Sequence, residues 1–226
     1  MSNRVRMDPE FRLRLLTGTG IVACIVMCIL GGGTSWSVLL ALLVLQGWRE
    51  ARSAFALACP HWGVALGALL AVVVVIVPAA GLWGLGWYQG DYTSATLIGW
   101  FVLVWANDSF AYLVGRRWGK TRIAPTVSPG KTWEGWFGGM VATVLLGALV
   151  LAPAIGSSGP SAMTWGVLAL IVSVLGPVGD LSESALKRQA GLKDSGNILP
   201  GHGGVLDRFD SHFISAPIAA ILLQLF

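Results

Sequence analysis

The residues best suited to chemistry lie in one polar segment, residues 179–211, with the sequence GDLSESALKRQAGLKDSGNILPGHGGVLDRFDS. This segment holds five of the eleven acidic residues and four of the fifteen basic ones, and apolar runs lie on both sides of it. Carboxylates beside a bilayer are costly and are usually found where ions, protons or charged substrates bind. The segment therefore predicts a site for a charged ligand at the edge of a membrane.

The spacing within the segment predicts a helix that ends in an irregular loop. Asp180, Glu183, Ser184 and Lys187 follow at i, i+3, i+4 and i+7, so they share one helical face. The Pro-Gly-His-Gly-Gly loop at 200–204 cannot be regular helix, and its glycines free backbone N–H groups to face an anion.

A second acidic pair opens the helix after the loop. Asp207 and Asp210 are three residues apart on a common face, and Arg208 between them is a bidentate phosphate donor. Oxygen ligands suit Mg²⁺, and lysine and arginine suit phosphate oxygens. The segment therefore predicts a Mg²⁺–nucleotide site. Simpler alternatives stay open, because Glu183 can pair with Lys187 at i+4 and single lysines can be ordinary loop charges.

Composition places the chain among polytopic membrane proteins. It has 226 residues, 55% hydrophobic and 12% charged, with a mean hydropathy of +0.72. We expect an all-α fold of about seven transmembrane helices in one membrane domain, 1–226, with generic hydrophobic helices in 1–92 and the chemistry in 93–226. The predicted spans are 14–31, 35–48, 62–83, 93–113, 135–153, 163–186 and 209–226.

Some N-terminal features leave more than one interpretation. The span 35–48 is short, so it is re-entrant or oblique, and residues 49–61 are amphipathic and expected along the membrane surface. The basic start followed by an apolar run resembles a signal peptide, but no small-x-small cleavage site closes the run. The three cysteines lack metal-binding spacing and an even count, so we expect them to be structural.

The basic residues predict the orientation. All fifteen lysines and arginines fall on one side of the predicted topology, whereas the opposite connections contain only Asp91 as a charge. The positive-inside rule places the N-terminus and every basic loop in the cytoplasm and the C-terminus outside. The short basic loops lack any nucleic-acid recognition element, so we expect no nucleic acid partner.

Two further stretches add candidate residues. Asn107 and Asp108 interrupt the fourth span, and Asp108 either pairs with a nearby arginine or belongs to the site.

Lys131 follows Ser128 in a loop from which it can reach a phosphate, unless it is an ordinary cytoplasmic lysine. A P-loop is excluded, since its earlier glycine would fall at Pro125. Gly135 and Gly139, four residues apart, favour a helix-packing face, and His202 is either a phosphate contact or a loop scaffold.

Beyond these generic features, residues 184–210, SALKRQAGLKDSGNILPGHGGVLDRFD, resemble the hallmark of the phosphatidate cytidylyltransferases, or CDP-diacylglycerol synthases. WANDSFAYLVGR at 105–116, SPGKTWEGWFGG at 128–139 and Gly179-Asp180 also agree with that family. The resemblance covers about the last 125 residues, and many bacterial members are longer at the N-terminus.

The resemblance implies a Mg²⁺-dependent integral membrane enzyme that joins CTP and phosphatidic acid into CDP-diacylglycerol and pyrophosphate. It implies a metal site involving Asp180 and Asp207, with a second cation as an option, and catalytic roles for these two residues, Lys187 and Arg208. The expected substrate-binding residues are Asn107, Asp108, Ser128, Lys131, Glu183, Ser184, Arg188, Lys193, Asp194, His202, Gly203, Gly204 and Asp210.

We expect the bacterial cytoplasmic membrane as the location, with the site open to the cytoplasm and sideways to lipid, and a homodimer is an option. Two rival functions stay open. One is a cytidylyltransferase acting on another lipid phosphate, and the other is a transporter, which the clustering of charge at one face disfavours.

Overall fold

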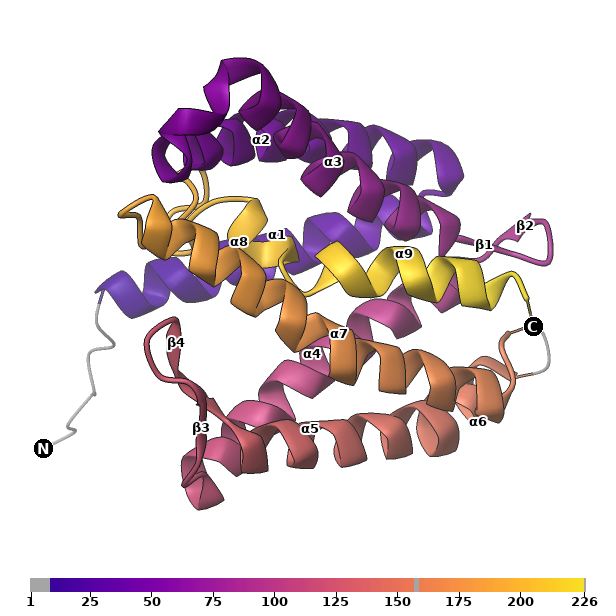
Figure 1. The fold of residues 1–226 in the computed structure, drawn as a ribbon. Coiled ribbons are helices and arrows are strands. Elements are labelled where there is room, and N and C mark those ends of the chain that lie inside the picture. The colour runs from indigo at the N-terminus through magenta and orange to yellow at the C-terminus, as the bar shows by residue number, and fades with distance from the viewer. Residues whose placement is uncertain (1–8, 157–158, 226) are drawn as a thin grey trace, which may run out of the picture.

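The computed structural model describes residues 9–156 and 159–225 as a bundle of helices with two small hairpins (Figure 1). The helices are α1 Pro9–Leu30, α2 Gly33–Ala58, the 3-10 turn η1 Pro60–Trp62, α3 Gly63–Gly84, α4 Ser94–Trp118, α5 Trp133–Leu146, the π-helical turn η2 Gly147–Leu151, α6 Ala152–Ile155, α7 Ala162–Gln189, α8 Leu206–Phe209 and α9 His212–Leu223. The strands are β1 Trp87–Tyr88, β2 Asp91–Tyr92, β3 Arg122–Ala124 and β4 Ser128–Thr132.

The helices confirm an all-α membrane protein. Within the described residues, five helical stretches are long and apolar enough to cross a membrane, and α9 is a shorter apolar helix. These five stretches, α2 and α9 correspond to the seven predicted segments. The five are Arg12–Leu30, Ala65–Gly84, Ser94–Trp118, Trp133–Ile155 and Ala162–Gln189.

The second predicted segment and the expected surface segment form one helix. Helix α2 runs for 26 residues without a break to Ala58, so the boundary predicted at residue 48 was wrong, while the surface position predicted for 49–61 stays a prediction. The cause is local, because the sequence after residue 48 contains no helix breaker before Pro60, which opens the 3-10 turn η1. Helix α7 likewise continues through Pro177 into the polar segment.

Tight helix packing holds the site-bearing half together. Trp36, Trp100 and Trp165 are fully buried in the main hydrophobic core. Helix α5 lies along α4, and a Cβ added at Gly139 would stand 2.9 Å from Ala111 Cβ and 3.0 Å from the carbonyl oxygen of Asn107. The predicted glycine packing face on α5 is therefore confirmed, and it fixes the height of α4 against α5.

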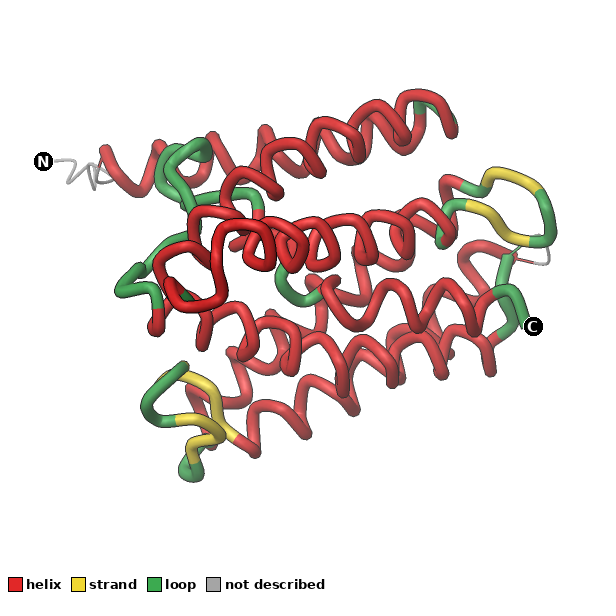
Figure 2. The backbone as a smooth tube through the Cα atoms, turned by 45° about the horizontal axis from the view of Figure 1, so that its top comes forward, coloured by secondary structure: helices red, strands yellow, loops and turns green. Residues whose placement is uncertain are grey.

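The two ends of the bundle differ in charge. The start of α1, the ends of α2, α4 and α7, the β3–β4 hairpin and α8 carry the basic residues and lie at one end, on the left in Figure 1. The β1–β2 hairpin and the α6–α7 connection lie at the other end, as Figure 2 also shows. Arg4 and Arg6, which belong to the predicted basic side, lie outside the described residues.

The β3–β4 hairpin was expected as an irregular loop. Its strands are antiparallel, with Arg122 opposite Thr132 and Ala124 opposite Ser128. Thr132 then caps α5, since its hydroxyl accepts a hydrogen bond from the Gly135 N–H at 3.2 Å. The hairpin thus holds Lys131 on a strand directly before a capped helix.

Candidate functional site

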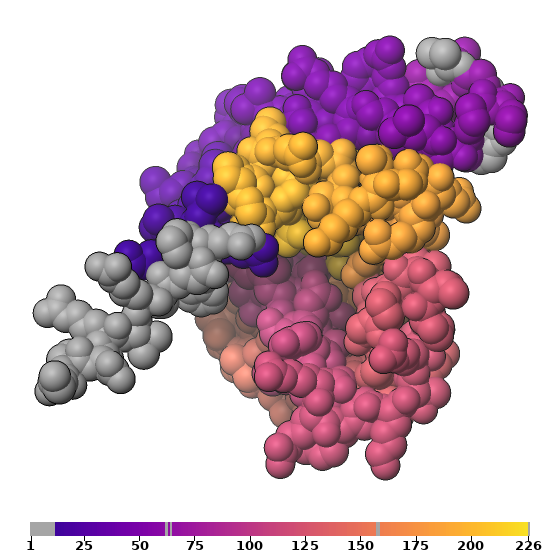
Figure 3. Space-filling model, turned by 90° about the vertical axis from the view of Figure 1, so that its left-hand side faces the viewer, coloured from indigo at the N-terminus to yellow at the C-terminus, as the bar shows by residue number. Residues whose placement is uncertain are grey.

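A cavity of about 630 Å³ opens at the basic end of the bundle. Its walls come from α1, α4, the β3–β4 hairpin, α7, α8 and the loop before α8. Figure 3 looks onto this end, where the surface is hollowed between the hairpin region and the segment that leads to α8. Because the walls come from both halves of the chain, the cavity forms only when the bundle is assembled.

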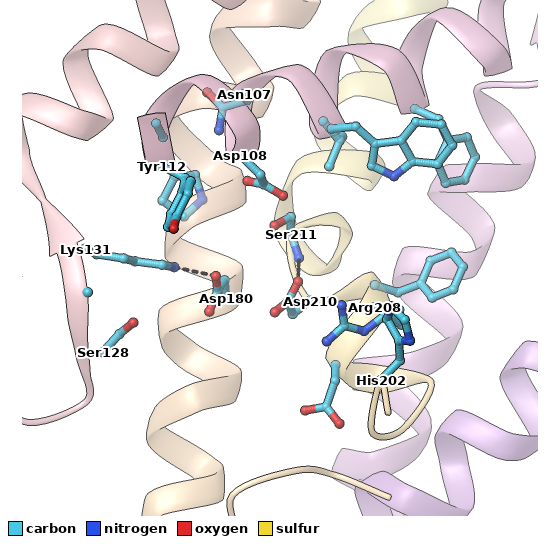
Figure 4. Close-up of a pocket in the computed structure, with 18 of the residues that line it drawn as sticks. Asn107, Asp108, Tyr112, Ser128, Lys131, Asp180, His202, Arg208, Asp210 and Ser211 are labelled. Atoms are coloured by element: carbon cyan, nitrogen blue, oxygen red, sulfur yellow. Dashed lines mark hydrogen bonds and ion pairs between the residues drawn. The ribbon is translucent and has the colours of Figure 1, made fainter. Parts of the chain in front are cut away.

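Three carboxylates from separate elements face one another inside this cavity (Figure 4). Asp108 comes from α4, Asp180 from α7, and Asp210 from the turn between α8 and α9. They lie close enough to repel one another, and Lys131 Nζ lies 2.5 Å from Asp180 Oδ2. We call these four residues the cavity cluster. Its carboxylates outnumber the lysine that neutralises them.

The electrostatic consequence is clearest at Asp210, which lies outside the membrane-spanning helices. Its burial, followed by repulsion from Asp180 and Glu183, raises the pKa of Asp210 to about 8. Among the described residues, no ion pair offsets this burial and repulsion at Asp210. The cavity cluster is therefore a place where an added cation would relieve repulsion.

The remaining cavity wall is polar on one side and apolar on the other. Ser128, Tyr112, His202 and Arg208 lie around the carboxylates, and in Figure 4 the Arg208 side chain extends toward Asp210. The opposite wall is hydrophobic and comes from α1 and the middle of α4, through Ile21, Val22, Ile25, Phe101 and Trp105. Such a surface suits a ligand with a charged part and an apolar part.

Asn107 is a polar side chain held inside the bundle at the cavity. It is 2% exposed, and its Oδ1 atom has no hydrogen-bond partner among the described residues. A buried amide oxygen without a partner is costly, which favours a ligand donor at this place.

A second group of charges lies deeper, between α7 and α8, and we call it the inner cluster. Lys187 Nζ lies 2.7 Å from Glu183 Oε2 and 2.5 Å from Asp207 Oδ1. Asp207 Oδ2 also accepts three hydrogen bonds, from the Ser195 N–H at 2.8 Å, the Ser195 hydroxyl at 2.9 Å and the Gly204 N–H at 2.8 Å. Lys187 and these hydrogen bonds compensate the charge of Asp207, whereas Glu183 has only its ion pair with Lys187 among the described residues.

These contacts set the titration of Asp207. Burial alone would raise its pKa, but the Lys187 ammonium and the N–H groups of Gly204 and Ser195 outweigh burial and hold it below its usual value. The loop glycines make the geometry possible. Gly203 has a φ of 81°, and a Cβ there would stand 2.7 Å from Asp207 Oδ2.

The cavity gathers about half of the residues that the sequence singled out. Its lining includes Asn107, Asp108, Ser128, Lys131, Asp180, His202, Asp207, Arg208 and Asp210. Glu183, Lys187 and Gly204 lie in or beside the inner cluster, and the Ser184 hydroxyl donates to Asp180 Oδ1 at 3.2 Å.

Three predicted substrate-binding residues lie away from the lining. Arg188 is exposed and donates to the Leu192 carbonyl oxygen at 3.2 Å, and Lys193 and Asp194 are exposed on the following loop. None of the three lines the cavity, and their binding roles stay predictions.

Sequence reasoning missed Glu50 and Ser195, which touch the inner cluster. Glu50 is 5% exposed on α2 and accepts a hydrogen bond from the Ser195 hydroxyl at 3.0 Å. An acid inside the basic run WREAR is typical of a surface charge, so the local composition does not predict a buried Glu50. The available signal was the glycine pair Gly196 and Gly204, whose missing side chains make room for Glu50.

The donor set of the cavity cluster fits a hard divalent cation. Among the described residues, no group of three or more His, Cys, Asp or Glu side chains is placed to hold a metal ion by itself. Mg²⁺ does not need such a cage, because it keeps several waters and binds through one or two carboxylates plus substrate phosphates. Asp180 and Asp210, beside Asp108, provide the required kind of oxygen ligand.

Fold and site together define a polytopic helical membrane protein with an acidic cavity at the basic end of its bundle. The sequence model of the cytidylyltransferase family matches residues 69–226, which is more than half of the chain. The chain therefore belongs to the cytidylyltransferase family.

Several curated relatives match part of this sequence. A phosphatidate cytidylyltransferase of Brucella abortus biovar 1 (strain 9-941) is 44% identical over 160 residues, covering 66% of this chain and 56% of the relative. Those of Bacillus subtilis (strain 168) and Staphylococcus epidermidis (strain ATCC 12228) are 49% and 45% identical over 128 and 125 residues. These two matches cover 55% and 54% of this chain and 46% of each relative. The chain thus spans about half the length of the curated relatives it matches.

Proposed function

We propose that this protein transfers CMP from CTP to phosphatidic acid, giving CDP-diacylglycerol and pyrophosphate. The observation that carries the proposal is the cavity cluster, which lies in the part of the chain that belongs to the cytidylyltransferase family and beside an apolar wall. The names of the relatives, phosphatidate cytidylyltransferase, support the same reaction.

The lipid phosphate is an anion at neutral pH, so its attack on CTP needs no strong general base. The difficulty is to bring two anions together. Lys131, on its strand, and Arg208, at the cavity edge, are placed to bind phosphate oxygens. The cavity walls hold nucleotide and lipid in one orientation, which favours in-line attack.

We propose that Asp180 is a ligand of Mg²⁺. Asp210, from the turn between α8 and α9, is proposed as a second ligand. When bound, Mg²⁺ supplies positive charge to the reacting phosphate and to the leaving pyrophosphate. Asp207 remains a proposed ligand through Oδ1, which pairs with Lys187, whereas its Oδ2 already accepts three hydrogen bonds.

Orientation and location follow from the same proposal. CTP is a cytoplasmic solute, and the basic end of the bundle is expected on the cytoplasmic face by the positive-inside rule. Phosphatidic acid would enter past the apolar wall of α1 and α4. A bacterial cytoplasmic membrane and a homodimer stay predictions.

The test is an assay of purified protein with labelled CTP and phosphatidic acid, with and without Mg²⁺. We expect CDP-diacylglycerol only when CTP, phosphatidic acid and Mg²⁺ are all present. Polyprenyl phosphate or ether lipid phosphates as better acceptors would favour a related lipid cytidylyltransferase. Solute flux in proteoliposomes without nucleotide would favour a transporter.

A substitution of Asp207 tests its proposed role as a metal ligand. Asp207→Asn is expected to abolish turnover while the protein stays folded in detergent. Near-normal cytidylyl transfer by this variant would remove Asp207 from the metal site.

A further inference from the structure

Glu50 is a buried acid in the part of the chain that the cytidylyltransferase family model does not match. It lies on α2, and the family match begins at residue 69. Neither the proposed metal site nor the proposed phosphate contacts use it. A carboxylate that is 5% exposed must be satisfied by its surroundings, so its partners reveal its role.

Among the described residues, Glu50 accepts hydrogen bonds from four residues, and three of them belong to the segment 195–206 beside the inner cluster. Its Oε1 accepts hydrogen bonds from the Val205 N–H at 3.1 Å and from Gln46 Nε2 at 2.9 Å. Its Oε2 accepts from the Leu206 N–H at 3.0 Å and from the Ser195 hydroxyl at 3.0 Å. Glu50 thus holds the backbone after the glycine loop and the Ser195 side chain before it.

The Ser195 hydroxyl joins this carboxylate to Asp207. The same oxygen lies 2.9 Å from Asp207 Oδ2, and a hydroxyl has a single hydrogen to share between two acceptors. The Ser195 N–H also donates to Asp207 Oδ2. The positions of the two carboxylates are therefore coupled through one residue of the loop.

Two loop glycines are shaped to the Glu50 side chain. A Cβ added at Gly196 would stand 2.7 Å from Glu50 Oε1 and 2.9 Å from its Cδ, and a Cβ at Gly204 would stand 2.7 Å from the same Cδ. Real Cβ atoms do not approach this closely, so these glycines leave room for a residue of α2.

We propose that Glu50 is a positioning residue that holds the 194–206 segment so that Asp207 and Lys187 keep their place beside the cavity. This inference rests on the proposed function for its effect on turnover, but its structural part does not. It also gives α2, in the half of the chain with generic hydrophobic sequence, a role in the site.

The first experiment measures hydrogen exchange of single backbone amides in the Glu50→Gln variant, with Arg49→Gln as the matched control. Arg49 is the exposed neighbour of Glu50 on the same helix. We expect the amides of Val205 and Leu206, whose charged acceptor becomes a neutral amide with a single accepting oxygen, to exchange at least about tenfold faster. If Glu50 positions Asp207, the amides of Ser195 and Gly204, which donate to Asp207, will also exchange faster.

Different outcomes separate a positioning role from a local one. Faster exchange confined to Val205 and Leu206 would make Glu50 a local cap and overturn the proposal, as would no change at all. Faster exchange throughout the chain would indicate a general loss of stability and would also count against it.

The second experiment is a double-mutant cycle. It compares the effect of one substitution in two backgrounds, so its result does not depend on how well a single variant folds. Gly196→Ala is expected to lower kcat about tenfold, with a smaller effect on KM for CTP, because its methyl group displaces Glu50. In the Glu50→Ala background the same change should cost less than about twofold, since the clash is gone. An equal cost in both backgrounds would overturn the proposal.

The two kinds of measurement distinguish the two proposals. If the unmodified protein makes no CDP-diacylglycerol but the Ser195 and Gly204 amides respond to Glu50→Gln, the proposed function fails and the positioning role stands. If the protein is active and those amides do not respond, the positioning role fails alone.

Discussion

The cavity cluster and the inner cluster contain the same residue types, with one lysine to three carboxylates in the first and one lysine to two in the second. In the inner cluster, Lys187 lies between two carboxylates, and backbone N–H groups donate to Asp207. In the cavity cluster, Lys131 pairs with Asp180 and also faces Asp108, whereas Asp210 forms no ion pair among the described residues. Asp207 and Asp210 are three residues apart in sequence, yet their pKa values are shifted in opposite directions.

This difference separates two roles that look alike in the sequence. A buried lysine between two carboxylates holds its surroundings in place, because removing it leaves both carboxylates buried without a counter-charge. An under-compensated cluster beside a cavity is available to a ligand, because a cation relieves its repulsion. The following predictions test whether the division is real.

The largest expected effect is on turnover when the cavity cluster loses its central carboxylate. Asp180→Asn should lower kcat for cytidylyl transfer by about a thousandfold, since a ligand for the cation and the partner of Lys131 are lost together. The melting temperature in detergent should stay within a few degrees of the unmodified protein, because the ion pair is partly exposed. Activity above a tenth of normal would place the cation elsewhere.

The inner cluster should respond in the opposite way, in stability. Lys187→Met leaves Glu183 and Asp207 buried without their ammonium partner, and we expect a loss of about 3–5 kcal/mol in the free energy of unfolding. Denaturation in mixed detergent micelles measures it. Lys131→Met is the matched control, with an expected loss of at most about 1 kcal/mol. Equal losses in the two variants would contradict the division between the clusters.

The sequence predicted more of the fold than of this division. Hydrophobic length gave the spanning helices, and glycine spacing gave the packing of α5 on α4, because both are local properties. Helix periodicity correctly placed Asp180, Glu183 and Lys187 on α7. It could not say that Asp180 borders the cavity while Lys187 points into a buried pair, since that depends on which elements pack against α7.

What the sequence did not reveal has the same origin. Glu50 lies far from the glycine loop in sequence, and only tertiary packing brings it to Ser195. Arg188 and Lys193 belong to the hallmark segment but lie outside the cavity lining, Arg188 exposed near the end of α7 and Lys193 exposed on the loop after it, and their binding roles stay predictions. Spacing along a helix carries no information about contacts between distant segments.

A smaller effect on turnover is expected when the cavity cluster loses its lysine. Lys131→Met should lower kcat/KM for CTP by about ten- to a hundredfold, because one charged contact to phosphate is lost while the carboxylates remain. Lys131→Arg should recover part of this loss, since the charge returns with a different shape. Full activity of Lys131→Met would assign Lys131 to Asp180 alone and leave phosphate binding to Arg208.

The smallest expected effect is a pH dependence of stability, and it has opposite signs in the two clusters. The folded pKa of Asp210 is about 8, and an unfolded aspartate has a pKa of about 3.9. Between these values the unfolded chain has lost the proton that the folded protein keeps, so stability falls as pH rises from about 4 to about 8. For Asp207, whose folded pKa is lowered, stability is instead lost below about pH 4, as pH falls toward the folded pKa.

The melting temperature in detergent with a chelator measures both windows. We expect it to fall by at least about 4 °C between pH 5 and pH 8, and Asp210→Asn should flatten this slope, which separates Asp210 from the histidines that titrate in the same range. Added Mg²⁺ should raise the melting temperature more at pH 8 than at pH 5, because protonation of Asp210 competes with cation binding. A slope that persists in Asp210→Asn, or a Mg²⁺ effect that is independent of pH, would show that the cavity carboxylates are already compensated, and the contrast between the two clusters would no longer hold.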